Sequence, residues 1–172
     1  MRILFLFLNL FFAAVCNGQS TAQQQHQIDS IVSYIDLDKA QVSSSFSLPN
    51  LAAAYHYTRY SYLSKKGSIS KISKRFGSHQ QSILQVFYFR NDELIYSTET
   101  GSTYFLTSGK SDSSSWNDSY YFSKGKLIDA VTHDDRKAIP ERWSPEVDVK
   151  ANAISAQNAV KRQLKKQVVR SS

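Results

Sequence analysis

Hydrophobic and polar residues follow four successive patterns along the chain, and the first lies at its N-terminus. The segment Met1–Val15 is an almost unbroken apolar run that contains a single arginine. It is shorter than the roughly 20 residues that a membrane-spanning helix needs, and small residues follow it. The run therefore predicts a signal peptide over residues 1–18 and an exported chain that begins near Gln19, secreted or periplasmic, without a transmembrane segment.

Cys16 leaves a second possibility for this segment. Cleavage after Gly18 suits an ordinary signal peptidase, because a small residue then occupies the last position before the cut. Alternatively, Cys16 is the lipidated residue of a lipoprotein, and two acyl chains would anchor the protein at a membrane. Val15 argues against a lipoprotein, since a small residue is expected in front of a lipidated cysteine.

The second pattern is helical and begins after a polar stretch. Residues 19–27 are polar and predict a flexible leader. Apolar residues then recur at helical spacing, at Ile28, Ile31, Val32 and Ile35. We therefore expect a helix over about residues 22–38. Serines, a proline and an asparagine over residues 43–50 predict a break after it.

From Ala53 to His133 the third pattern, rich in aromatic and β-branched residues cut by short polar turns, is typical of strands. A motif repeats within it: three mostly aromatic residues, a four-residue turn and two aliphatic residues. Copies start at Phe87 and Tyr120, and a weaker one starts at Ser61. Each copy predicts a hairpin, so the region predicts an antiparallel meander of about six strands.

Two-residue turns at Asn91-Asp92 and Lys124-Gly125 would fix the pairing, because these residues tolerate positive φ. The predicted opposite pairs are Phe89 with Leu94, Tyr88 with Ile95, Phe122 with Leu127, Tyr121 with Ile128, and Arg90 with Glu93. We expect the polar segment 107–118, which contains Trp116, to be a long loop between hairpins.

The chain ends in a clear helix signal. Ser144 suits an N-cap, Pro145 suits the first helical position, and acids follow in the first turn. One apolar stripe contains Val149, Ala153, Ala156, Val160, Leu164 and Val168. The fold class is therefore α+β: residues 19–172 form one domain with an N-terminal helix, a meander sheet and a C-terminal helix packed on the sheet. The N-terminal helix is short, so part of one sheet face is expected to stay open as a binding surface.

Charge adds a candidate binding region to this picture. The chain carries a formal charge of +7, and no acid lies between Ala40 and Asn91. Aromatic and basic residues coincide on the first hairpin, which gives the candidate ligand-binding residues Tyr57, Arg59, Tyr60, Lys65, Lys66, Lys71 and Lys74. Such a patch favours an anionic envelope lipid or an acidic polysaccharide, or a protein partner; an exported chain is not expected to meet nucleic acid. The alternative is a solvated strand whose lysines protect a sheet edge.

Catalytic chemistry is not indicated. Cys16 is the single cysteine, so the mature chain has no thiol or disulfide, which favours a bacterial source. The sequence His133-Asp134-Asp135 is the one place where a base adjoins carboxylates, and a polar turn explains it. No cofactor, metal or catalytic motif is present. We therefore expect an exported binding or accessory protein, and the alternative is a secreted hydrolase with an unrecognised active site.

Overall fold

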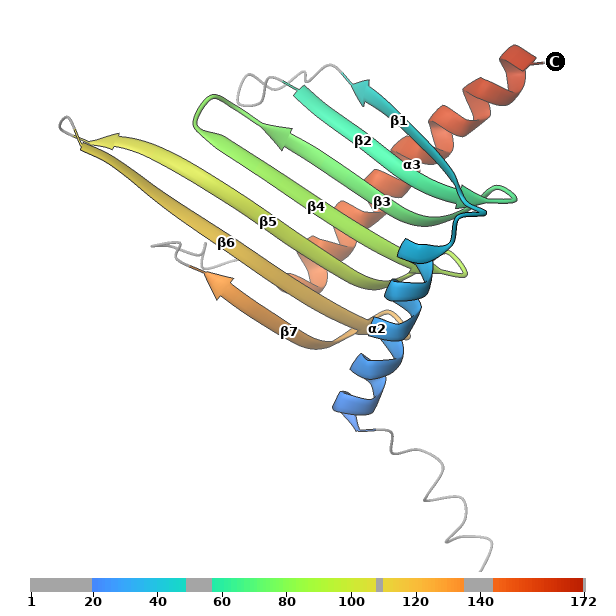
Figure 1. The fold of residues 1–172 in the computed structure, drawn as a ribbon, viewed down its shortest axis with the longest axis horizontal. Coiled ribbons are helices and arrows are strands. Elements are labelled where there is room, and N and C mark those ends of the chain that lie inside the picture. Colours follow the sequence, from blue (N-terminus) through green and yellow to red (C-terminus); the bar gives the residue numbers. More distant parts are fainter. Residues whose placement is uncertain (1–19, 49–56, 108–109, 135–143, 172) are drawn as a thin grey trace, which may run out of the picture.

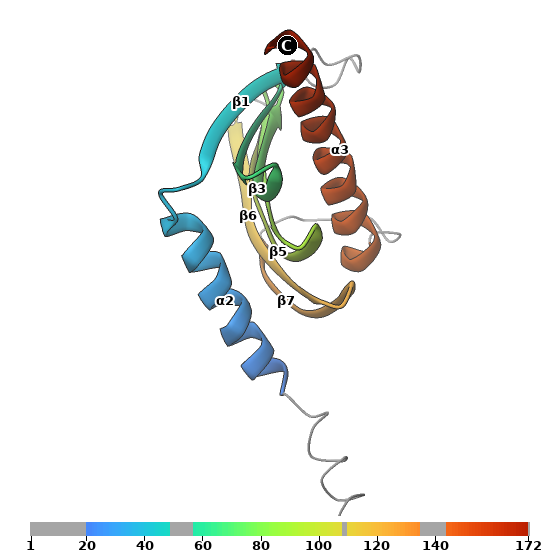
Figure 2. The ribbon, with the colours of Figure 1, turned by 90° about the vertical axis from the view of Figure 1, so that its right-hand side faces the viewer.

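The computed structural model describes residues 20–48, 57–107, 110–134 and 144–171. Its elements are α2 (Thr21–Leu37), β1 (Val42–Leu48), β2 (Tyr57–Lys65), β3 (Ser68–Gly77), β4 (Gln81–Arg90), β5 (Glu93–Thr107), β6 (Lys110–Ser123), β7 (Lys126–Asp134) and α3 (Pro145–Ser171). The seven strands form one antiparallel sheet in chain order (Figure 1). The two helices lie on opposite faces of this curved sheet (Figure 2). The α+β prediction is confirmed, with seven strands in place of about six.

The repeated motif forms three hairpins, β2–β3, β4–β5 and β6–β7. Both residues of each turn have positive φ, as a type I′ turn requires: 51° and 80° at Lys66-Gly67, 53° and 64° at Asn91-Asp92, 51° and 71° at Lys124-Gly125. The three turns lie at the same edge of the sheet (Figure 1). This edge is called the turn edge below.

Strand pairing beside these turns agrees with the prediction for the residues nearest the turn, and beyond them the register is shifted by one residue. Phe89 faces Leu94, Phe122 faces Leu127, and Arg90 faces Glu93, as expected. Tyr88 faces Tyr96, not Ile95, and Tyr121 faces Asp129, not Ile128. A β-bulge in each hairpin adds one unpaired residue, which local patterning does not reveal and which increases the strand twist. The β2–β3 hairpin has the same bulge, at Ser70.

Two polar segments that were predicted to lack regular structure are strands. Strand β1 contains the serines that were expected to break the chain, and Phe46 holds it by stacking on Tyr60 with 5.1 Å between ring centroids. The predicted loop over 107–118 is wrong, because β5 and β6 stay paired as far as Thr107 and Lys110. Trp116 lies within β6 and is buried. Backbone hydrogen bonds to a neighbouring strand hold these segments without apolar alternation.

Helix α2 matches the helix expected over about residues 22–38 to within one residue at each end. Ser20 and Gln23 form a reciprocal capping box, so residues 21–27, expected as part of a flexible leader, are helical. The helix crosses one face of the sheet near the turn edge and contacts it mainly through polar side chains. Its hydrogen bonds run from Gln25 to Asp129, from Tyr121 to Asp29, and from Tyr88 to Asp36. Only the side chains of Ile28 and Ile35 are buried.

Helix α3 covers the other face and forms the main core. The predicted stripe is confirmed from Val149 to Leu164; the side chain of Val168 lies outside the described residues. Ala153, Ala156 and Val160 have at most 1% of their surface exposed, so small side chains let the helix approach the sheet closely. They pack on buried sheet residues that include Ile72, Phe87, Tyr120 and Phe122.

Contacts of α3 follow the hairpin repeat. Lys150 donates to the carbonyl of Gly125, and Gln157, seven residues later, donates to Asp92. Leu164, seven residues further, lines a cavity with Gly67. Seven residues of helix advance about 10.5 Å, close to the roughly 9.6 Å between alternate strands. Successive heptads of α3 therefore meet successive turns along the turn edge.

Candidate anion-binding corner

The candidate binding residues of the first hairpin are divided between the two faces of the sheet and a turn. The pairing puts Arg59 and Lys71 on the face that α2 covers, and Tyr60 and Lys74 on the α3 face. Lys65 and Lys66 lie at the β2–β3 turn. Tyr57 starts β2, and its side chain lies outside the described residues. The structure does not bring the seven residues onto one surface.

Two of these lysines are balanced by carboxylates of the α2 segment. Lys65 Nζ lies 3.0 Å from Asp38 Oδ2, and Lys71 Nζ lies 2.7 Å from Asp36 Oδ1. The hydrogen bond with Lys65 lowers the pKa of Asp38, and the same bond raises the pKa of Lys65. The charge imbalance counted along the sequence is therefore partly compensated in space, across separations of 27 and 35 residues.

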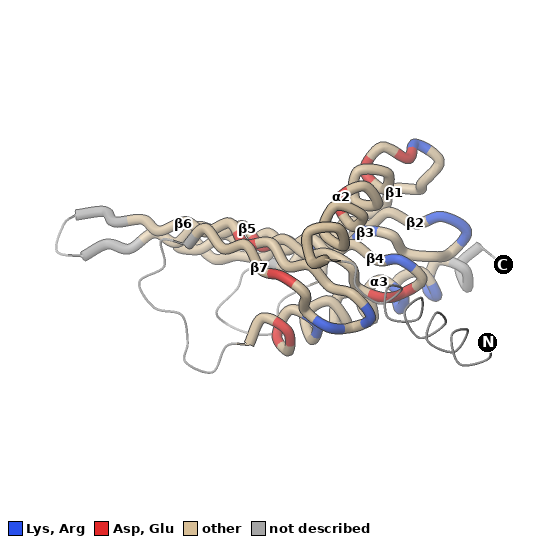
Figure 3. Tube along the Cα trace, turned by 90° about the horizontal axis from the view of Figure 1, so that it is seen from below, with Lys and Arg blue, Asp and Glu red and all other residues tan. Residues whose placement is uncertain are grey.

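The structure brings the β2–β3 turn next to the basic half of α3. A cavity of about 500 Å³ lies between them. Its lining residues are Gly67, Asn158, Lys161, Arg162, Leu164 and Lys165. We call these residues, together with Lys65 and Lys66, the basic corner. Figure 3 shows Lys and Arg gathered toward the end of the molecule that carries the hairpin turns.

Several cations of the basic corner are available to a ligand. Lys161 pairs with Asp92 at 3.1 Å, whereas Arg162, Lys165 and Lys66 form no ion pair with any residue that the structure describes. Gly67 has a φ of 80°, and no atom lies within 4 Å of the place where its Cβ would stand. The cavity thus combines unpaired cations with an uncovered turn, a combination that suits an anionic group.

The candidate residues on the first hairpin include Lys65 and Lys66 of this corner but none of the cations of α3. The basic residues of the C-terminal helix and the lysines of the first turn stand out as charge clusters. Their proximity depends on the heptad match between α3 and the hairpins, which requires the sheet order and the bulged strand pairing. Neither can be read from a charge count.

A second cluster forms a polar ladder on the α3 face, beyond the apolar core. Lys74, Gln85, Glu99 and Asp118 follow one another across four neighbouring strands. Glu99 accepts hydrogen bonds from Gln85 at 2.7 Å and from the indole of Trp116 at 2.9 Å. Asp118, fully buried, accepts one from the Tyr120 hydroxyl at 3.2 Å. These bonds join the side chains of the ladder to one another inside the fold, while Oε1 of Gln85 is buried without a hydrogen-bond partner among the described residues.

Lys74 makes this ladder sensitive to pH. Burial lowers its pKa, so between that value and the ordinary lysine value near 10.4 the unfolded chain binds more protons than the folded one. Stability contributed by Lys74 therefore rises with pH across that window. We expect the free energy of unfolding of the wild type, relative to Lys74→Gln, to increase from neutral pH to about pH 10. Urea titrations measure it, Lys126→Gln controls for net charge, and a constant difference would contradict the prediction.

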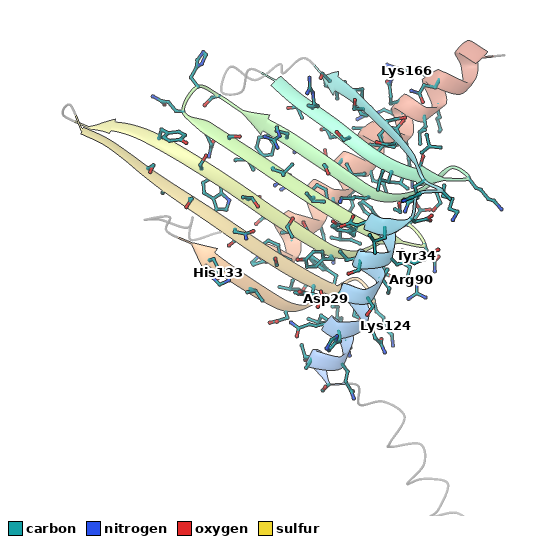
Figure 4. The ribbon with its side chains drawn as sticks, viewed as in Figure 1. Asp29, Tyr34, Arg90, Lys124, His133 and Lys166 are labelled. Carbon is teal, nitrogen blue, oxygen red and sulfur yellow. The ribbon has the colours of Figure 1, made fainter. Side chains whose placement is uncertain are left out.

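Residues considered for catalysis or metal binding are dispersed. His133 is exposed on β7, on the sheet face opposite to α3, and His26 is exposed on α2; His56 lies outside the described residues. Figure 4 shows His133 away from the turn edge. Within the described ranges, no three His, Cys, Asp or Glu side chains are grouped to hold a metal ion.

No protein-family model matches the chain, and no similar curated protein or solved structure was found. The class of the protein therefore rests on its own architecture: an α+β meander sheet between two helices, with a cationic corner on its turn edge. In the part of the chain that the structure describes, no helix has the length and apolar character needed to cross a membrane.

Proposed function

We propose that this protein is an exported binding or accessory protein that holds an anionic partner at the basic corner. One observation carries the proposal: Lys161, Arg162 and Lys165 line a single cavity with the backbone of Gly67. Cations around an open cavity attract an anion over a distance of about one Debye length, roughly 8 Å at physiological salt. The apolar run Met1–Val15 supports the exported location.

A soluble polyanion tests this function. We expect heparin, used as a model acidic polysaccharide, to bind with an affinity that falls steeply between low and physiological salt. Arg162→Ala with Lys165→Ala should weaken binding at low salt by roughly tenfold, at up to about 1 kcal/mol for each exposed charge. Isothermal titration calorimetry measures both effects.

The matched control is Lys124→Ala with Lys126→Ala, which removes the same charge at the β6–β7 turn. This variant should retain nearly all of the heparin affinity, because its lysines lie outside the cavity. Equal losses in the two double variants would show that heparin senses only net charge, and the basic corner would then not be the site.

A further inference from the structure

Exposed apolar side chains border the basic corner. Leu37, at the end of α2, is 78% exposed, and Val42, at the start of β1, is 63% exposed. Leu37 precedes Asp38, which binds Lys65, and Val42 faces Ser64 across the strand pair. Both apolar side chains therefore stand beside the turn that carries Lys65 and Lys66. A soluble polyanion would use the lysines but would gain little from these apolar groups.

A groove continues this apolar border along the turn edge. It has a volume of about 430 Å³ and lies between α2 and the end of β4. Ile31, Tyr34, Ile35 and Phe89 give it apolar walls, and Arg90 stands at its rim. Tyr34 is 66% exposed, and Figure 4 shows it close to Arg90 at the turn end of the sheet. Arg90 therefore lies next to the apolar side chains of this groove, as Lys65 and Lys66 lie next to Leu37 and Val42.

Alternation of cations with exposed apolar and tyrosine side chains matches the chemistry of a membrane interface. Anionic headgroups attract lysine and arginine at about 1 kcal/mol per charge near the surface. Apolar side chains gain by entering the boundary between headgroups and acyl chains, and tyrosine favours that depth. Tyr104, which is exposed on the far part of β5, faces Ser113 across the strand pair and has no lysine at the neighbouring paired positions.

We propose that the partner at the basic corner is a bilayer surface that contains anionic lipids. The protein lies on it through the end of α2, the start of β1 and the β2–β3 turn, with Leu37 and Val42 at headgroup depth. This inference rests on the proposed anion-binding function and names its partner. It separates two contributions: cations that a soluble polyanion can also use, and apolar groups that only a membrane can use.

Vesicle co-sedimentation of the purified protein, with every variant carrying the same native N-terminus, tests the inference. The probes are phosphatidylcholine vesicles with phosphatidylglycerol and vesicles of phosphatidylcholine alone. Leu37→Gln with Val42→Thr keeps the local helix and strand preferences and removes apolar surface. We expect about tenfold weaker binding to the anionic vesicles and unchanged binding to heparin. Tyr104→Thr, the control for an exposed apolar side chain elsewhere, should bind like wild type.

Matched turn variants test the contribution of charge. Lys66→Asn and Lys124→Asn remove one charge each at the same φ of 51°, and Asn91 occupies the corresponding turn position in β4–β5. Lys66→Asn should weaken binding to anionic vesicles about fivefold, and Lys124→Asn should weaken it clearly less.

Four outcomes distinguish the proposals. Loss of vesicle binding in the apolar variant, with heparin binding intact, supports both of them. Unchanged vesicle binding in the apolar variant overturns the membrane inference and leaves anion binding standing. Equal losses in Lys66→Asn and Lys124→Asn would likewise overturn docking through the β2–β3 turn. If wild type binds neither heparin nor anionic vesicles, the proposed function itself fails.

Discussion

The substitution Gly101→Ala is expected to lower the free energy of unfolding by about 3 kcal/mol, although it adds only one methyl group. The Trp116 indole lies directly on Gly101, so that a Cβ atom would stand 2.0 Å from Cζ2 and 2.3 Å from Cε2 of the ring. The indole must move, which costs about 1–3 kcal/mol of overpacking and breaks its 2.9 Å hydrogen bond to Glu99. Urea unfolding measures the loss.

Trp116→Leu provides the control for this prediction. Without the indole, Gly101→Ala should become neutral or stabilising, because glycine in a strand interior costs conformational entropy. Tryptophan fluorescence adds a second readout: in a Trp143→Phe background, displacement of Trp116 by Gly101→Ala should shift the emission to the red. A stability loss of the same size with leucine at position 116 would contradict the ring-packing explanation.

Local chemistry allowed the hairpins and the last helix to be predicted. Asn91-Asp92 and Lys124-Gly125 form type I′ turns because their residues accept positive φ. The first predicted aromatic–aliphatic pair beside each turn is present, whereas the second is displaced by a bulge. The apolar stripe of α3 likewise predicted which side of the helix is buried. In each case the structural cause lies within a few residues of the signal.

The failed predictions depend on distant partners. Strand β1 joins the sheet because Phe46 stacks on Tyr60, and the β5–β6 extension is held by its neighbouring strand despite its polar sequence. The charge of Lys71 is balanced by Asp36 of α2, and that of Lys65 by Asp38, the residue that caps the end of α2. Except in the β5–β6 hairpin, where Thr107 pairs with Lys110, these partners lie far apart in sequence.

The candidate site also depends on contacts between residues that are distant in sequence. The three hairpin turns follow one another at even intervals along the turn edge. Along α3, Lys150 meets the β6–β7 turn, Gln157 meets the β4–β5 turn, and the basic half that follows reaches the β2–β3 turn at Gly67. Lys161 binds Asp92 of the β4–β5 turn, which leaves Arg162 and Lys165 for a ligand at the basic corner. The binding surface is thus a consequence of the helix–hairpin match, and variants that weaken this packing should weaken binding as well.

Phe87→Ala is expected to produce the largest loss of stability, about 3–5 kcal/mol, a large part of the 5–15 kcal/mol available to a typical domain. Phe87 lies on the central strand β4, is 1% exposed, and packs under α3 in the main core. Val86 is its matched control, because it occupies the next position on the opposite, half-buried face. Val86→Ala should cost about 1 kcal/mol in the same urea titration. Similar losses at the two positions would mean that α3 does not cover the face assigned to it, and the basic corner would lose its structural basis.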